Sequence, residues 1–222
     1  MIIAERKPVN EIVEMVRDAQ RILVLGCRGC VSVCSAGGDR EVELLCSLIR
    51  LGKKKAGQQA EVTGASLVRQ CDKEYIDEID QWQGQYDAIV SMACGVGVNF
   101  IANLRPNDQV FPAVNTTSYG GSPEQGVWTE QCAGCGDCVL HLTGGLCPVA
   151  RCAKSLSNGP CGGSVDGHCE IHQEVPCIWQ FIYERLSRFE RREDLERVAP
   201  IRDWRTAGHG GPRKTVRDDL TM

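Results

Sequence analysis

Residues 21–34 read RILVLGCRGCVSVC, and this stretch decides how the first half of the chain is expected to fold. The apolar run 21–25 ends at Gly26, which is typical of a short strand buried inside a sheet. Three thiols follow this strand directly: Cys27, Cys30 and Cys34. The stretch therefore predicts a central strand with cysteines at its carboxyl end.

Strand-like and helix-like segments alternate from here to about residue 120. We expect helices over 9–20, 40–51, 74–82 and 97–104, and strands over 21–25, 61–68, 88–93 and 109–114. Such alternation predicts an α/β domain over 1–120, small and Rossmann-like, with a parallel sheet. The sequence GCRGC after the first strand lacks the G-x-G-x-x-G spacing of a dinucleotide phosphate loop, so a metal site is favoured over a nucleotide site.

Further cysteines follow the next two predicted strands. Cys71 comes after the second strand, and Cys94 ends the third. Because parallel strands place their carboxyl ends along one edge of a sheet, these thiols are expected to meet there. We predict a metal site made of Cys27, Cys30, Cys34 and Cys94, with Cys71 as an additional candidate ligand. Cysteine-only sites serve both zinc and iron–sulfur clusters, so the metal stays open.

Cys46 has a different interpretation. It lies on an apolar helical stripe with Val42, Leu45 and Ile49, at a spacing of i, i+3, i+4 and i+7. Free cysteine is readily buried as a small apolar side chain. We therefore expect Cys46 in the core.

The second half of the chain holds eight of the 14 cysteines, all between residues 131 and 178. Cys132, Cys135 and Cys138 form a C-x2-C-x2-C run, and Cys147 precedes a proline, as in bacterial ferredoxins that bind [4Fe–4S] clusters. The remaining four thiols are Cys152, Cys161, Cys169 and Cys177. Eight thiols suffice for two four-cysteine centres, so we predict two [4Fe–4S] clusters, with zinc as a candidate at one centre. Spacing alone does not assign the later cysteines to individual centres.

The stretch TTSYGGSPEQG at 116–126 is rich in turn-forming residues and marks the expected domain boundary. Beyond it we predict an irregular, metal-stabilised, ferredoxin-like module over 121–177, and a C-terminal helix and tail over 178–222. Metal binding would supply much of the module's folding free energy, on the order of 10 kcal/mol per site. The helix is expected to bury one face, formed by Ile178, Phe181, Ile182 and Leu186. His168 and His172 flank Cys169 and are expected to be exposed rather than zinc ligands.

Composition excludes several classes of function. A net charge of −4 gives no general attraction to nucleic acid. No apolar run approaches the roughly 18–20 residues that span a bilayer. The first residues lack the basic-then-apolar layout of an export signal, which favours a cytoplasmic protein with reduced thiols. No acid/base pair or nucleophile–histidine motif stands out, so we predict no catalytic residues.

Long stretches of the chain resemble a known family. Residues 135–163 (CGDCVLHLTGGLCPVARCAKSLSNGPCGG), 166–170 (DGHCE) and 176–186 (PCIWQFIYERL) resemble the methylenetetrahydrofolate reductase C-terminal domain family. GCRGCVSVC at 26–34 and SMACGVG at 91–97 are similar to it as well. As a free-standing chain, the sequence is similar to the iron–sulfur and zinc accessory subunits of acetogen-type methylenetetrahydrofolate reductases.

The resemblance implies a role in a heteromeric oxidoreductase of one-carbon metabolism and acetogenesis. The chain would be a non-catalytic subunit that relays electrons from an upstream donor protein to a flavin-bearing TIM-barrel catalytic subunit. That partner would reduce methylenetetrahydrofolate to methyltetrahydrofolate, and the flavin would belong to it. Two alternatives stay open. The chain would act as a zinc-stabilised structural adaptor without electron transfer, or carry zinc–thiolate methyl-transfer chemistry at Cys94 and the thiols near it.

Overall fold

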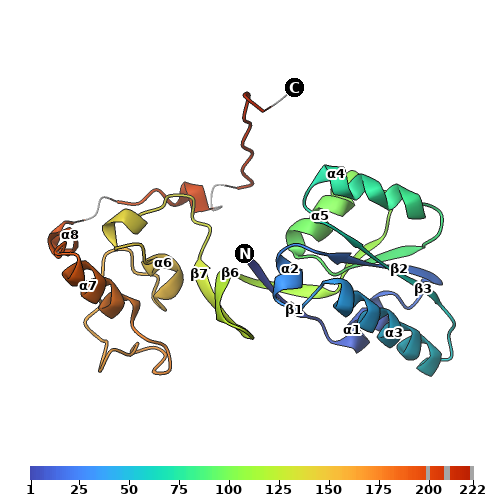
Figure 1. Ribbon diagram of the computed structural model, residues 1–222, viewed down its shortest axis with the longest axis horizontal. Helices are drawn as coiled ribbons and strands as arrows, with labels where there is room; N and C mark the ends of the chain where they lie inside the picture. The colour runs from blue at the N-terminus through green and yellow to red at the C-terminus, as the bar shows by residue number, and fades with distance from the viewer. Residues whose placement is uncertain (199–200, 208–210, 221–222) are drawn as a thin grey trace. The chain divides into compact units, whose positions relative to one another are not determined.

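The computed structural model describes residues 1–198, 201–207 and 211–220 and divides the chain into two compact units. The first unit comprises Met1–Thr129 and the second Glu130–Met222 (Figure 1). In the described part of the chain, no helix combines the length and the apolar character needed to cross a membrane.

The first unit is built around a four-stranded parallel sheet, which confirms the predicted α/β class. The strands follow the order β3-β2-β4-β5 and are β3 (Glu61–Leu67), β2 (Arg21–Cys27), β4 (Ala88–Ser91) and β5 (Val110–Pro112). β2 lies in the interior of the sheet, and every residue from Ile22 to Cys27 is buried. The apolar run at 21–25 thus forms the central strand, as expected.

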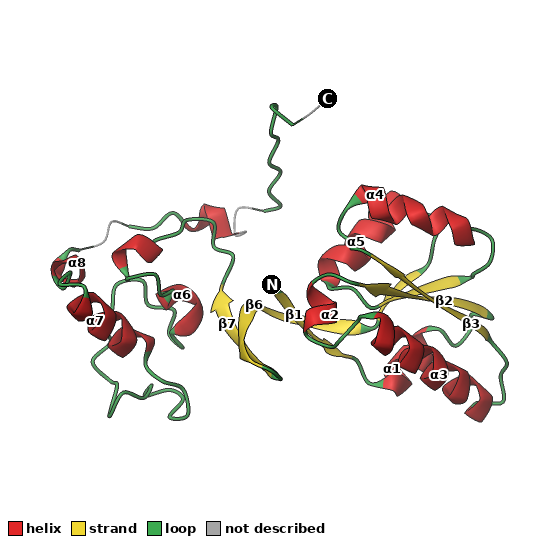
Figure 2. Cartoon of the chain, viewed as in Figure 1, coloured by secondary structure: helices red, strands yellow, loops and turns green. Residues whose placement is uncertain are grey.

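Helices cover both faces of this sheet (Figure 2). α1 (Val9–Met15) and α3 (Asp39–Lys55) pack on one face, against Ile22 and Val24 of β2. The opposite face holds α4 (Lys73–Ile76), the 3₁₀ helix η1 (Asp77–Trp82) and α5 (Gly95–Leu104), which pack with Leu23 and Leu25. Successive residues of a strand point to opposite faces, so one short run supplies both cores. A further short helix, α2 (Cys30–Val33), follows β2.

Interactions at both ends of α3 favour its helical conformation. Glu41 reaches back to the backbone N–H of Gly38 at 2.9 Å, which satisfies one free donor at the helix start. Three lysines occupy the last turn, where the helix dipole favours positive charge. Cys46 is 4% exposed and packs in the core, as predicted.

The first helix is shorter than the sequence predicts. α1 ends at Met15 rather than at residue 20. The reason lies in α3, because the ammonium group of Lys53 donates to the carbonyls of Val16, Arg17 and Ala19 at 2.6, 2.6 and 3.0 Å. Lys53 of α3 thus supplies the hydrogen bonds that these carbonyls would otherwise need from further turns of α1. The helix can therefore end at Met15, and the chain continues to β2.

A second sheet was not expected from the sequence. β1 (Ile2–Arg6) pairs antiparallel with β6 (Val114–Glu124), and β7 (Val127–Cys132) completes the order β1-β6-β7. Most of the turn-rich stretch at 116–126 is therefore a strand instead of a loop. Its glycines suit close pairing, since a Cβ at Gly120 would lie 2.1 Å from the carbonyl oxygen of Thr129. Pairing on both sides overrides the low strand propensity of glycine and serine.

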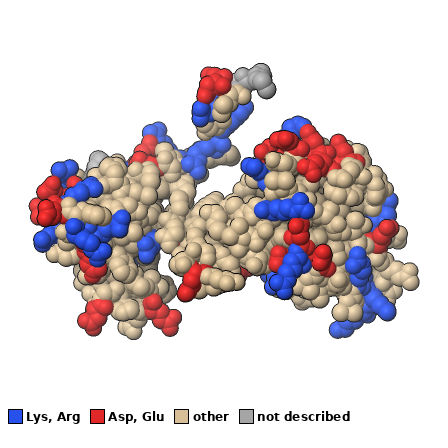
Figure 3. Space-filling view, viewed as in Figure 1, with Lys and Arg blue, Asp and Glu red and all other residues tan. Residues whose placement is uncertain are grey.

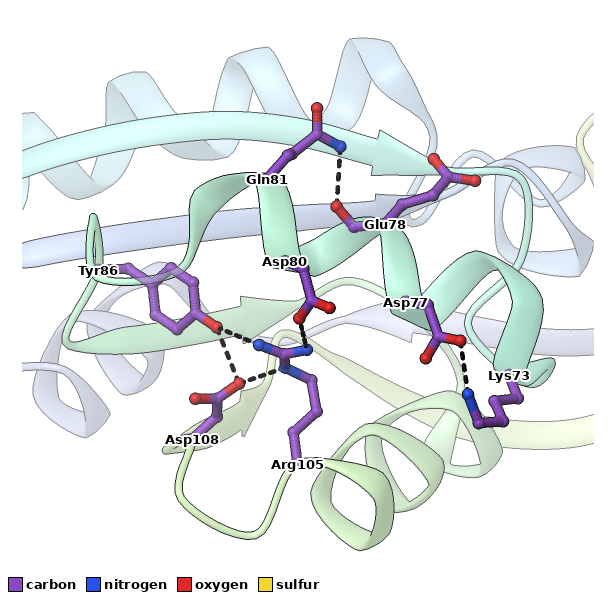
Figure 4. A network of polar contacts seen from close by, with 8 residues as sticks. All are labelled: Lys73, Asp77, Glu78, Asp80, Gln81, Tyr86, Arg105 and Asp108. Atoms are coloured by element: carbon purple, nitrogen blue, oxygen red, sulfur yellow. Dashed lines mark hydrogen bonds and ion pairs between the residues drawn. The ribbon is translucent and has the colours of Figure 1, made fainter.

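α5 is fixed at its C-terminal end by a polar network around Arg105 (Figure 4). Arg105 binds Asp80 at 2.6 Å and Asp108 at 2.5 Å, and the hydroxyl of Tyr86 donates to Asp108 at 2.8 Å. Burial by itself would lower the pKa of Arg105, but the hydrogen bonds to Asp80 and Asp108 raise it overall. The guanidinium stays charged and joins α5 to η1.

The surface near this network is acidic. Acidic side chains gather over α4 and η1, including the exposed Glu74, Asp77 and Glu78 (Figure 3). This surface repels the phosphates of nucleic acids.

The second unit has a small apolar core and many loops. Its helical segments are η2 (Leu140–Leu142), α6 (Pro148–Arg151), α7 (Ile178–Arg188), α8 (Glu193–Glu196) and η3 (Trp204–Ala207). The predicted C-terminal helix is confirmed as α7. Its buried face differs from the prediction, because Trp179 is buried whereas Phe181 is 40% exposed. Trp179 packs where Gly159 leaves room, since a Cβ at that glycine would lie 2.6 Å from the indole.

Candidate metal centres

Three cysteines stand at the carboxyl ends of neighbouring strands in the first unit. Cys27 is the last residue of β2, Cys71 follows β3, and Cys94 follows β4 as the residue that caps α5. Cys27 is buried, Cys94 is half-buried and Cys71 is exposed. All three therefore follow the carboxyl ends of parallel strands, at one edge of the sheet.

The surroundings of Cys27 act on its pKa in both directions. Burial raises the pKa of this thiol, and backbone hydrogen bonds from Gly29 and Gln70 partly offset the rise. The neighbouring thiols Cys94 and Cys71 raise the pKa further, because their negative charges would repel a thiolate. Cys27 therefore interacts electrostatically with both of the other thiols.

The other cysteines of the first unit have different surroundings. Cys34 is buried, and its sulfur lies 3.6 Å from the carbonyl oxygens of Ala4 and Val31. It lines a cavity of about 620 Å³ beside β1, together with Trp128. Cys30 is half-buried and opens α2. Cys34 packs in one apolar cluster with Cys27 and Cys94, whereas the exposed Cys71 lies outside that cluster.

In the second unit, four cysteines line one narrow cavity of about 20 Å³: Cys152, Cys161, Cys169 and Cys177. The first caps the end of α6, and the last caps the start of α7. The other two lie in the connecting loop, held by short backbone bridges at His168. This grouping selects four of the thiols that sequence spacing leaves unassigned.

Backbone N–H groups approach two sulfurs of the cavity, while a carboxylate oxygen of Glu170 lies 3.5 Å from the sulfur of Cys161. Backbone hydrogen bonds from His172 and Ile171 lower the pKa of Cys169, and the charge of Lys154 lowers it further. The N–H of Gly163 donates to the sulfur of Cys161 at 3.4 Å. Hydrogen bonds of this kind stabilise thiolate ligands and tune the potential of iron–sulfur clusters.

The ferredoxin-like cysteines lie outside this cavity. Cys132 and Cys138 are exposed, while Cys135 and Cys147 are half-buried. The guanidinium of Arg202 lies 2.8 Å from the sulfur of Cys135. The N–H of Gly134 donates to the sulfur of Cys132 at 3.3 Å. These sulfurs also have donors beside them. Two of the four ferredoxin-like cysteines are exposed, against one of the four cavity cysteines, Cys161.

The side chains do not yet form a closed coordination sphere. Among the residues that the structure describes, no three His, Cys, Asp or Glu side chains stand close enough together to hold a metal ion. The donor set of the cavity nevertheless suits soft metals, because thiolates are the ligands of zinc and of iron–sulfur clusters. A volume of about 20 Å³ admits a single ion. A cluster would require the lining loops to move apart. His168 and His172 are exposed, as predicted.

Gln70 is a site residue that the sequence did not reveal. Its side chain is fully buried, and its amide donates to the carbonyls of Leu25 and Gly26 at 2.8 Å each. It ties the loop that carries Cys71 to the end of β2. The one available signal was its position directly before a cysteine, which by itself predicts no such contact.

A comparison with known protein families matches the second unit and the last residues of the first. Residues 111–205 match the family model described as Methylene-tetrahydrofolate reductase C terminal. No curated protein and no solved structure was found to match the chain. The matched segment includes all four cavity cysteines and all four ferredoxin-like cysteines. It follows that residues 111–205 are related to the C-terminal region of methylenetetrahydrofolate reductases.

Proposed function

We propose that the chain is an electron-transfer accessory subunit of a methylenetetrahydrofolate reductase. The observation that carries this proposal is the cavity shared by Cys152, Cys161, Cys169 and Cys177 inside the family-matched segment. It leaves the ferredoxin-like cysteines as a second set of four. The eight thiols thus divide into two groups, each large enough for one four-cysteine centre.

Both groups reach the surface, which suits a relay, because Cys161 of the cavity is exposed as well as Cys132 and Cys138. Cys132 and Cys138 are exposed, so a centre held by them would lie near the surface, where electrons are exchanged with another protein. Arg202 places positive charge beside Cys135, whereas Lys154 beside Cys169 forms an ion pair with Glu170. An added electron is stabilised by positive charge and by N–H donors, so both features raise the reduction potential.

The partners follow from the same proposal. Electrons would enter from an upstream donor protein and leave to the flavin of a TIM-barrel catalytic subunit. That subunit would reduce methylenetetrahydrofolate to methyltetrahydrofolate. The cysteines of this chain would hold iron–sulfur clusters. The partner would carry the flavin and the folate-binding site.

Metal analysis tests the first step. After anaerobic purification, roughly four iron and four sulfide are expected for each cluster present. Cys135→Ser removes the iron of one cluster, whereas Cys46→Ser, which changes a core thiol, leaves the iron content unchanged. A chain that contains neither iron nor acid-labile sulfide would contradict the relay.

Flavin reduction tests the second step. The chain is mixed with a flavin-bearing methylenetetrahydrofolate reductase subunit and a reduced low-potential donor, and the flavin absorbance is followed. We expect rapid bleaching with the unchanged chain and with Cys46→Ser, and slow bleaching with Cys135→Ser. Equal rates with and without the chain would reject electron transfer.

One observation favours a second function. The cavity of about 20 Å³ has room for one ion as its side chains stand, which matches a structural zinc site. In that case the chain would act as an adaptor that stabilises the catalytic subunit. Zinc without iron, together with tight binding of the catalytic subunit and no effect on flavin bleaching, would favour this reading.

A further inference from the structure

The C-terminal segment of the second unit lies across the ferredoxin-like loop, residues 132–138. The hydroxyl of Thr206 donates to the carbonyl oxygen of Cys135 at 2.7 Å. The guanidinium of Arg202 binds the sulfur of Cys135 at 2.8 Å and also binds the carbonyl oxygen of Asp137. Two residues of the C-terminal segment therefore hold both the backbone and the thiol of the middle cysteine.

Gly136 makes room for this crossing. Its φ of +80° is in the left-handed region, and a Cβ there would lie 2.5 Å from the carbonyl oxygen of Thr206 and 2.9 Å from Nη1 of Arg213. The same nitrogen of Arg213 donates to the Thr206 carbonyl, and its Nη2 lies 3.5 Å from the carbonyl oxygen of Gly134. A side chain at position 136 would therefore push the C-terminal segment off the loop.

These contacts account for a difference in exposure among the three cysteines of the loop. Cys132 and Cys138 are exposed, whereas Cys135, midway between them, is half-buried. Cys135 is the cysteine that Arg202 and Thr206 contact. The C-terminal segment thus covers the middle thiol and leaves the outer two accessible.

Two nitrogens of Arg202 lack acceptors. The guanidinium lies over the ring of Trp204, 4.8 Å from its centre, which helps to fix its position. Its Nε and Nη1 are buried and have no hydrogen-bond partner among the residues that the structure describes. A buried donor without a partner costs free energy. The sulfurs of an iron–sulfur cluster accept hydrogen bonds, so a cluster held by Cys135 would supply acceptors beside Arg202.

We infer that residues 202–207 and Arg213 form a clamp on the ferredoxin-like loop, in which Arg202 positions Cys135 and donates hydrogen bonds to the cluster bound there. The role of Arg202 toward a cluster rests on the proposed function, whereas the clamp itself does not. Thr206 and Arg213 lie beyond the family-matched residues 111–205, so the family match does not assign them this role.

Amide hydrogen exchange tests the clamp on the full-length chain as purified anaerobically. Peptide mass spectrometry follows the exchange of residues 201–207. Thr206→Val removes the hydroxyl that binds Cys135 and should speed this exchange about tenfold, because the segment opens more often. Thr206→Ser keeps a hydroxyl and should exchange at the rate of the unchanged chain. Equal rates in the two variants would overturn the clamp.

A second pair of variants tests the same contact from the side of the loop. Gly136→Ala should speed the exchange of residues 201–207 at least about tenfold, because its Cβ collides with the C-terminal segment. Gly145→Ala is the control for backbone strain, since Gly145 also has a positive φ, +90°, but a Cβ there would have nothing within 4 Å. Unchanged exchange in Gly136→Ala, or equally fast exchange in Gly145→Ala, would contradict the clamp.

The reduction potential tests the role of Arg202. It is measured by redox titration of the electron paramagnetic resonance signal that Cys135→Ser abolishes. Arg202→Gln removes the positive charge and should lower the potential, whereas Arg202→Lys should lower it less. Arg205→Gln breaks an exposed pair with Asp203 and should leave the potential unchanged. The same potential in Arg202→Gln as in the unchanged chain would refute this role.

Metal content and exchange rates separate this inference from the proposed function. A chain without iron would refute the relay, and the exchange rates would still decide whether the clamp exists. A chain with iron in which Thr206→Val and Gly136→Ala leave the exchange unchanged would refute the clamp and leave the relay intact.

Discussion

The hydroxyl of Ser91 donates a hydrogen bond of 2.6 Å to the side-chain oxygen of Gln70, and both residues are fully buried. Ser91 ends β4, and Gln70 lies in the loop after β3. Because the Gln70 amide also binds the last carbonyls of β2, one side chain joins the ends of three strands. These are the strands whose loops carry Cys27, Cys71 and Cys94.

Replacing Gln70 should weaken the sheet at this edge. Gln70→Met keeps the length of the side chain but removes three buried hydrogen bonds, although the Leu25 carbonyl still accepts from Met92 and the Ser91 oxygen from Ala93. A hydrogen bond contributes about 1 kcal/mol, so we expect the free energy of unfolding to fall by roughly 2–4 kcal/mol. Urea denaturation measures this loss. Gln81→Met, at an exposed glutamine, should change little, and equal effects of the two variants would contradict the assigned role.

Lys53 should stabilise the first unit through the three carbonyls that it binds. Its side chain is 1% exposed, while the neighbouring Lys54 is exposed. Lys53→Met is expected to lower the free energy of unfolding by about 2–3 kcal/mol, since three carbonyls lose a charged donor. Lys54→Met should have an effect within about 0.5 kcal/mol. Thermal or urea unfolding of the two variants distinguishes a buried cap from an ordinary surface lysine.

Lys53 also predicts a pH dependence. Burial lowers its pKa from the ordinary value of 10.5. Between the lowered pKa and 10.5 the unfolded chain binds more protons than the folded chain, so the free energy of unfolding rises with pH in that window. The cost of burying the charge is therefore fully present below the folded pKa. Urea titrations from pH 7 to 10 should show the unchanged chain gaining stability relative to Lys53→Met, and parallel curves would show that Lys53 has an ordinary pKa.

The two glycines after Cys94 should tolerate alanine very differently. A Cβ at Gly97 would lie 2.7 Å from the Cβ of Ala93, while a Cβ at Gly95 would have its nearest neighbour, the Thr116 hydroxyl, at 3.6 Å. Alanine favours a helix by up to about 1 kcal/mol over glycine, so Gly95→Ala should be neutral or stabilising. Gly97→Ala should lose about 1–3 kcal/mol from overpacking. Urea denaturation checks the order of the two, and a stable Gly97→Ala would refute the close contact with Gln70.

Arg105 should contribute more to the free energy of unfolding than the exposed charged residues of the same network. Its side chain is 13% exposed and binds Asp80 and Asp108. Arg105→Met leaves the largely buried Asp108 without its cation, so we expect a loss of about 2–3 kcal/mol in the free energy of unfolding. The control is Lys73→Met, which breaks an exposed pair with Asp77 and should cost at most about 0.5 kcal/mol. Similar losses in both variants would mean that the network of Figure 4 is a surface feature.

The parallel sheet was predictable because its signals are local. Residues 22–25 are too apolar to lie anywhere but in a core, and β2 continues past the glycine that follows them by one residue. The stripe of Val42, Leu45, Cys46 and Ile49 has helical spacing and is buried as that spacing predicts. The antiparallel sheet was not predictable in the same way. Its strand β6 is rich in glycine and serine and is extended because β1, more than 100 residues earlier, pairs with it.

The cysteines show the same division. The sequence by itself determined that thiols follow the strands of the first unit and crowd the second, because residue type and spacing are written in the chain. Only the tertiary structure decided which of them meet, because Cys34 and Cys71 lie in loops whose direction depends on distant partners. The sulfur of Cys34 lies 3.6 Å from the carbonyl oxygen of Ala4 in β1, and the contacts of Gln70 hold the loop that carries Cys71 near the end of β2. Which side chains lie close together depends on packing between distant segments, and a local sequence pattern does not predict that packing.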